Sequence, residues 1–92
     1  MSTDISIGSF NYFNINCLIG HDVMIGNYNV INPSVKLGGN VIIKDSNYLG
    51  LNSIIIQSVS ICSGCKIGVG AIIINNIIKK GTYFGAPARM FK

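Results

Sequence analysis

The sequence contains one histidine, His21, and an aspartate, Asp22, follows it directly. An imidazole can take a proton from an attacking hydroxyl or amine at neutral pH, and a neighbouring carboxylate can orient the ring. His21 is therefore a candidate general base, with Asp22 as its supporting carboxylate. Each residue also has a simpler explanation, because a lone histidine is usually a surface residue and aspartate is favoured in turns.

Two cysteines, Cys62 and Cys65, have the CxxC spacing of zinc and redox motifs. No second pair of cysteines or histidines exists to complete a zinc site, and Cys65 falls where small residues recur along the chain. The sequence therefore favours packed thiols over a redox centre, and we expect no bound metal.

A six-residue period must position these side chains. Every sixth residue is large and apolar, at Met1, Ile7, Phe13, Ile19, Ile25, Ile31, Leu37, Ile43, Leu49, Ile55, Ile61, Ile67 and Ile73. The residue after it is often glycine, and the fifth residue of each hexad is often small. We expect this register to continue without interruption through Ile78.

This period excludes an amphipathic α-helix, since six residues advance about 600° around a helix and the apolar stripe would spiral. Six residues per flat side and three sides per turn instead give a triangular coil of about 18 residues. The sequence therefore predicts an all-β fold, a single-stranded parallel β-helix of hexapeptide repeats over residues 1–78. A little over four coils would stand about 20 Å tall. Residues 79–92 are expected to form a short C-terminal capping tail.

Side chains three hexads apart lie above one another in such a coil. The column through His21 contains Thr3, His21, Gly39, Gln57 and Asn75. A glycine above the imidazole would leave open space and an exposed backbone N–H beside it. The column is therefore a candidate active-site notch, although an ordinary corner position explains Gly39 equally well.

The segment GHDVMIGNYNVINPSVKLGGNV, residues 20–41, resembles the hexapeptide-repeat acyltransferases, particularly the sialic-acid O-acetyltransferase-like and UDP-amino-sugar N-acetyltransferase group. The resemblance continues through IKDSNYLGLNSIII and into the tail GTYFGAPARMFK, so it covers nearly the whole chain. It implies a left-handed β-helix and an acetyl-CoA-dependent acetyltransferase acting on a hydroxyl or amine of a sugar or sugar nucleotide. It also implies a homotrimer with acetyl-CoA in a groove between subunits.

The resemblance assigns roles to particular residues. His21 would be the general base, Asp22 would orient it, and the Gly39 N–H would donate to the thioester carbonyl and its developing oxyanion. Leu51 and Val69, again separated by three hexads, match positions that line the pantetheine arm, and simple packing is the alternative for both.

The basic tail offers Arg89 for the CoA phosphates, because a guanidinium can hold phosphate oxygens in a fork. A solvated cap is the alternative explanation of the tail.

Charge and hydropathy patterning limit the partners. The net charge is +4 with only 11% of residues charged, and the lysines form no basic stripe, so we expect no nucleic acid. A small phosphorylated ligand suits this charge better. No apolar run approaches the roughly 20 residues of a membrane span, and the N-terminus lacks a signal-peptide pattern. We therefore expect a cytoplasmic chain without membrane insertion.

A noncatalytic trimeric scaffold, or a remnant lacking its acceptor-binding domain, is the competing hypothesis. The low charge predicts flat apolar sides that meet copies of the same chain, which suits either function. The family resemblance implies a separate N-terminal acceptor domain, whereas this chain begins almost at the β-helix. The acceptor and the choice between O- and N-acetylation therefore stay open, and the His–Asp–Gly group favours the enzyme.

Overall fold

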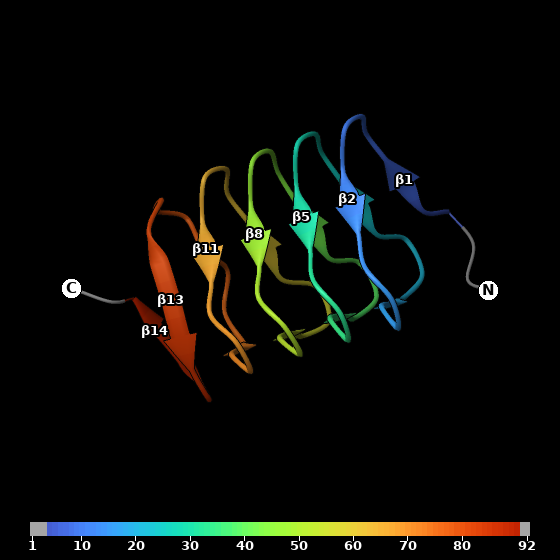
Figure 1. Cartoon of the computed structure of the whole chain (residues 1–92). Helices are drawn as coiled ribbons and strands as arrows, with labels where there is room; N and C mark the ends of the chain where they lie inside the picture. Colours follow the sequence, from blue (N-terminus) through green and yellow to red (C-terminus); the bar gives the residue numbers. More distant parts are fainter. Residues whose placement is uncertain (1–3, 91–92) are drawn as a thin grey trace.

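The computed structural model describes residues 4–90, which wind into a solenoid of about four turns. The molecule measures 36 × 22 × 21 Å, and β2, β5, β8 and β11 follow one another along its length in Figure 1. The all-β parallel coil predicted from the six-residue period is confirmed, and the arrangement is consistent with a left-handed β-helix. Residues 4–90 contain no helix long and apolar enough to cross a membrane.

Three parallel sheets form the sides of the coil, and most strands are two residues long. The first sheet contains β1 (Ser6–Ile7), β4 (Met24–Ile25), β7 (Ile42–Ile43) and β10 (Ser60–Ile61). The second contains β2 (Tyr12–Phe13), β5 (Val30–Ile31), β8 (Tyr48–Leu49), β11 (Lys66–Ile67), β13 (Thr82–Gly85) and β14 (Ala88–Met90). The third contains β3 (Leu18–Ile19), β6 (Lys36–Leu37), β9 (Ile54–Ile55) and β12 (Ile72–Ile73).

Adjacent coils pair with a constant offset of three hexads through β12. Ile7 pairs with Ile25, Ile25 with Ile43, and Ile43 with Ile61. This offset follows from three hexads per turn, and it places equivalent residues of successive turns on adjacent rungs. Met1 and Thr3, which the period also included, lie outside the described residues.

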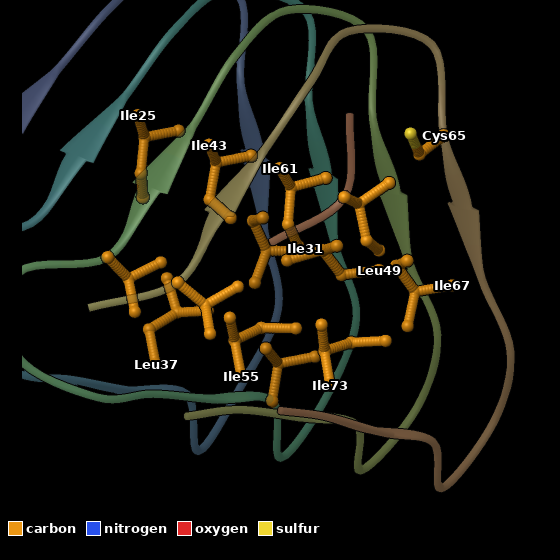
Figure 2. Packing of buried hydrophobic residues seen from close by; sticks show 14 of the residues in the cluster. Ile25, Ile31, Leu37, Ile43, Leu49, Ile55, Ile61, Cys65, Ile67 and Ile73 are labelled. Atoms are coloured by element: carbon orange, nitrogen blue, oxygen red, sulfur yellow. The ribbon is translucent and has the colours of Figure 1, made fainter. Parts of the chain in front are cut away.

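The first position of each hexad points inward and builds the core. From Ile25 through Ile73 these side chains are at most 4% exposed. Figure 2 shows them in rows, with Ile25, Ile43 and Ile61 in one row and Leu37, Ile55 and Ile73 in another. Ile7 is 47% exposed, because β1 pairs with β4 alone among the described strands.

As far as Gly70, the chain turns each corner with a left-handed residue at the fourth position of the hexad. These residues are Asp4, Phe10, Asn16, Asp22, Tyr28, Ser34, Asn40, Ser46, Asn52, Ser58, Gly64 and Gly70. Asn, Asp and Gly tolerate this conformation best, and a bulky residue there is unusual. Phe10 and Tyr28 are the bulky exceptions, and their exposed rings stack with centroids 5.2 Å apart.

Glycines at the second position reflect close contact between coils. A Cβ on Gly20 would lie 2.7 Å from the backbone nitrogen of Gly39, too close for any side chain. The repeated glycine of the sequence is therefore a packing requirement at the corner.

The corner after the first sheet, residues 8–11, 26–29, 44–47 and 62–65, carries a ladder of side-chain hydrogen bonds and is called the asparagine corner below. The backbone N–H of Asn29 donates to Asn11 Oδ1 (2.8 Å), that of Asn47 to Asn29 Oδ1 (2.8 Å), and that of Cys65 to Asn47 Oδ1 (2.7 Å). Asn29 and Asn47 are fully buried, so these bonds satisfy polar groups that would otherwise be costly.

The register changes in the last coil, where the sequence prediction is wrong. Ile77 forms a bridge with Ile61, and Tyr83 pairs with Ile67, so both offsets fall two residues short of three hexads. An unbroken period would place Lys79 at the buried first position, and an ammonium there would lose its hydration. Ile77, which is 5% exposed, occupies that place instead. The coil is therefore two residues shorter before β13 rejoins the second sheet.

The C-terminal segment ends in a hairpin. β13 runs parallel to β11, and β14 folds back antiparallel to β13 with Arg89 opposite Phe84. Figure 1 shows this hairpin at the end of the solenoid opposite β1. Tyr83 and Ala88 pack against the buried core from this end.

Candidate functional site

The candidate site lies on the corner after the third sheet, residues 20–23, 38–41, 56–59 and 74–77, which we call the histidine corner. Ile19 pairs with Leu37 in register, so His21 and Gly39 sit at the same point of successive coils. The backbone continues this stacking, since the Asn40 N–H donates to the His21 carbonyl and the Ser58 N–H to the Gly39 carbonyl, both at 2.9 Å. The side chain of His21 is thus carried on a regular, hydrogen-bonded frame.

His21 and Asp22 form a close pair at the surface. Nδ1 of His21 lies 2.9 Å from Oδ2 of Asp22, and the two side chains are 58% and 48% exposed. Asp22 has a φ of 56°, the left-handed conformation that recurs at the fourth position of the hexads as far as Gly70. In a neutral imidazole Nδ1–H donates to this carboxylate, which leaves Nε2 as the acceptor.

Nε2 of His21 faces Gly39. A Cβ built on Gly39 would lie 2.7 Å from Nε2 and 2.9 Å from Cε1. The absence of a side chain at residue 39 therefore makes room for the reactive end of the ring. The structure brings His21, Asp22 and Gly39 together, with the imidazole occupying part of the space above the glycine.

Arg89 reaches the same corner from the C-terminal hairpin. It is exposed, and it lines a hollow of about 150 Å³ with Asn75, Asn76 and Ile74 of the histidine corner. Asn75 is three coils along from His21, about 14 Å at the usual strand spacing. Arg89 and His21 thus lie at opposite ends of the histidine corner, which runs as one edge along the triangular solenoid.

Leu51 and Val69 lie on a different corner, formed by residues 14–17, 32–35, 50–53 and 68–71 and called the leucine corner below. Their side chains are 46% and 72% exposed. Within one chain, the structure does not bring them to His21.

Val69 lines a larger hollow beside the leucine corner, with a volume of about 510 Å³. Tyr48, Lys66 and Phe84 line it as well, and Lys66 Nζ lies 5.6 Å from the centre of the Tyr48 ring. Sequence reasoning did not single out Tyr48 and Lys66. Their spacing of three hexads, at the outward sixth position, was the signal that they share one side of the coil.

Comparison with known proteins places the fold. No protein-family model matches the sequence, and no curated protein matches it. A solved serine acetyltransferase in complex with cysteine superposes with a TM-score of 0.91 at 22% identity, over 97% of this chain and 38% of that chain. The chain has the fold of the hexapeptide-repeat acetyltransferases.

Two further solved structures agree. A hexapeptide-repeat-containing acetyltransferase from Vibrio cholerae O1 biovar eltor, complexed with acetyl coenzyme A, gives a TM-score of 0.90 at 20% identity over 98% of this chain and 60% of that chain. A polySia-specific acetyltransferase gives 0.87 at 22% identity, over 96% and 47%. This chain therefore spans between 38% and 60% of the lengths of these three proteins.

Proposed function

We propose that this chain is the β-helix of an acetyl-CoA-dependent acetyltransferase, with His21 as the general base. The observation that carries the proposal is the imidazole on the histidine corner, with Nδ1 2.9 Å from the Asp22 carboxylate and Nε2 directed at a glycine. The fold supports it, since the solved neighbours are acetyltransferases and one of them is complexed with acetyl coenzyme A.

In the proposed reaction Nε2 of His21 removes a proton from the acceptor hydroxyl or amine as the acceptor attacks the acetyl carbonyl carbon. The Gly39 N–H donates to the oxygen that becomes negative in the tetrahedral intermediate. The carbon–sulfur bond then breaks, and the imidazolium returns its proton to the departing CoA sulfur. Asp22 stabilises the imidazolium and holds the ring in position.

The edge of the prism suits an extended acyl donor. With the thioester at Nε2 of His21 and the donor laid along the histidine corner, its phosphates would reach Arg89 in the hollow with Asn75 and Asn76. A guanidinium suits that role because it holds phosphate oxygens in a fork.

A homotrimer would supply the remaining wall of the groove. Leu51 and Val69 are exposed on another corner of the same chain, so they can line a donor at His21 only if they come from a neighbouring subunit. Apolar side chains that point outward from the flat sides, such as Leu18 (60% exposed) and Met24 (55%), favour such self-association.

The acceptor that we propose is a sugar or sugar nucleotide. The polySia-specific acetyltransferase among the solved neighbours supports this class. Because this chain spans only part of each of those proteins, a partner domain or chain is expected to complete acceptor binding.

The test is a calorimetric titration of the purified chain with acetyl-CoA in a buffer where its oligomeric state is measured by sedimentation. Saturable binding of one donor per chain in a trimer is the expected result. No binding by a well-folded trimer would favour the alternative, a noncatalytic scaffold, for which the exposed apolar sides alone suffice.

His21→Ala separates the assigned base from the fold. We expect turnover to fall by about 10²- to 10⁴-fold, the usual contribution of a general base, with trimer and acetyl-CoA binding retained. Lys44→Ala, which changes an exposed side chain on the asparagine corner and away from the proposed donor path, is the control and should keep full activity. Turnover that survives in His21→Ala would refute the role of His21.

A further inference from the structure

The last rung of the asparagine corner carries two cysteines, Cys62 and Cys65. Cys65 occupies the position that is asparagine in the three earlier rungs. Sγ of Cys62 and Sγ of Cys65 lie 3.5 Å apart, and both cysteines are free. Cys65 is buried, at 2% exposure, whereas Cys62 is half-buried. Cys62 is therefore the more accessible of the two residues.

The chain that leaves the last coil lies against this rung at Lys79 and Lys80. The Lys79 carbonyl lies 3.9 Å from Cys65 Sγ and accepts a hydrogen bond of 2.6 Å from the Tyr83 hydroxyl. The aliphatic stem of Lys80 covers Gly64, within 3.1 to 3.3 Å of where its Cβ would be. A reagent therefore meets Cys62 before Cys65.

The rung also departs from the ladder below it. Nδ2 of Asn11 donates to the Gly26 carbonyl and Nδ2 of Asn29 to the Lys44 carbonyl, whereas buried Nδ2 of Asn47 has no partner among the described residues. The side-chain ladder that fixes the lower rungs is therefore incomplete next to the cysteines.

We propose that Cys62 and Cys65 are a dithiol site that closes reversibly into an intrachain disulfide. The two sulfurs need to approach by only about 1.5 Å to reach the S–S bond length of about 2.05 Å. Across residues 4–90 no group of three or more His, Cys, Asp or Glu side chains could hold a metal ion, so the pair lacks the further ligands of a zinc site.

The oxidant for this step is a low-molecular-weight disulfide such as oxidised glutathione. The Cys62 thiolate attacks one glutathione sulfur, the glutathione S–S bond breaks, and one glutathione leaves as its thiolate. The Cys65 thiolate then attacks Sγ of Cys62, and the second glutathione leaves. The two protons lost from the cysteines are taken up by the two glutathione thiolates, so the protein loses two electrons and the glutathione disulfide gains them.

The environment of Cys65 sets the behaviour of the bond. Burial and the neighbouring Cys62 thiol raise the pKa of Cys65 to about 11. A thiol of high pKa is a poor leaving group, so the closed disulfide is expected to be reduced slowly, and the glutathione equilibration must be long enough to include this step. Closure itself is expected to accelerate as the pH rises toward that pKa, because the attacking thiolate becomes more abundant.

The experiment equilibrates the full chain in glutathione buffers from fully reduced to fully oxidised and measures free thiols and intact mass. The expected result is a fall from three thiols to one, a mass loss of two hydrogen atoms and no retained glutathione. Peptide mapping of the unmodified chain should locate the bond between Cys62 and Cys65, so this readout needs no variant.

Two variants sharpen the test. Cys17 lies on the leucine corner, with its thiol 3.3 Å from the Asn14 carbonyl, so Cys17→Ser should close the disulfide normally. Cys62→Ser should keep both remaining thiols. Three thiols at every glutathione ratio, a stable glutathione adduct on Cys62, or bonds only between separate chains would each overturn the proposal.

Discussion

The asparagine corner and the histidine corner are built from the same hexad, yet they are held in different ways. At the asparagine corner the third-position N–H groups are capped by the next coil, since Ser9 N–H donates to Asn27 Oδ1 and Asn27 N–H to Asp45 Oδ1, both at 2.7 Å. At the histidine corner the coil above His21 has Gly39 at that position, which offers no side-chain acceptor.

The difference shows what the repeat requires and what it leaves free. Backbone hydrogen bonds between coils, such as Asn40 N–H to the His21 carbonyl, hold the histidine corner without a side-chain ladder. A corner that does not need its outer side chains for stability can present them to a ligand. The outer side chains of the asparagine corner therefore stabilise the coil, whereas those of the histidine corner are free to contact a ligand.

Among the changes that test the contrast between the corners, Gly39→Asn is expected to have the largest effect, because it would give the histidine corner the side chain that Asn27 has at the asparagine corner. A Cβ at residue 39 would lie 2.7 Å from Nε2 and must displace the imidazole. The new amide oxygen can accept a hydrogen bond from the backbone N–H of His21, as Asn27 Oδ1 does from the backbone N–H of Ser9. We expect acetyl transfer to fall by about 10²-fold or more, the cost of misplacing a catalytic group by about 1 Å. Steady-state kinetics measures the effect of the displaced imidazole, and thermal unfolding measures the effect of the new hydrogen bond to the His21 backbone N–H. Unchanged kinetics would show that the space at Nε2 is not needed.

Asn29→Ala should destabilise the asparagine corner. Asn29 is fully buried, and its loss would leave the Asn47 N–H and the Lys44 carbonyl without their side-chain partners. Unsatisfied buried groups cost about 1–3 kcal/mol each, so for these two groups we expect a loss of roughly 2–6 kcal/mol in the free energy of unfolding. Urea denaturation gives the value, and the exposed Gln57→Ala variant should change it by no more than about 0.5 kcal/mol. A similar loss in both variants would contradict the distinction between the corners.

Asp22→Asn carries the smallest expected effect. Asparagine tolerates the left-handed backbone of this position, so the fold should be unchanged. Its amide oxygen can still accept from Nδ1–H, and the charge lost from so exposed a pair is worth only about 0.2–1 kcal/mol, so we expect turnover to fall by roughly 5-fold or less. If the loss equals that of His21→Ala, Asp22 does more than orient the ring, and this result would require a revised mechanism.

Most of the coil could be predicted from the sequence because each hexad repeats one packing rule. Ile25 through Ile73 are buried at the predicted spacing. The register change was missed because Ile77 and Ile78 are both apolar and either suits the core. Lys79 was the available signal, since an unbroken period would bury its charge.

The candidate site was predicted as far as the repeat extends. The column of residues three hexads apart placed Gly39 over His21, and the structure has the glycine against Nε2. The position of Arg89 beside Asn75 could not be derived, because the C-terminal hairpin does not follow the hexad. The asparagine ladder was also missed, although Asn11, Asn29 and Asn47 recur every three hexads, because the pattern predicted small residues at this position and a buried asparagine is larger and polar.

Because the coils stack in parallel, the number of coils sets the length of the histidine corner. Each added or removed coil would change the separation between the His21 and Arg89 ends by one strand spacing, about 4.8 Å, without altering the cross-section. The length of ligand that can span this edge therefore changes in steps of one coil. A deletion of three hexads between Gly39 and Asn75 would bring the His21 and Arg89 ends closer by one strand spacing.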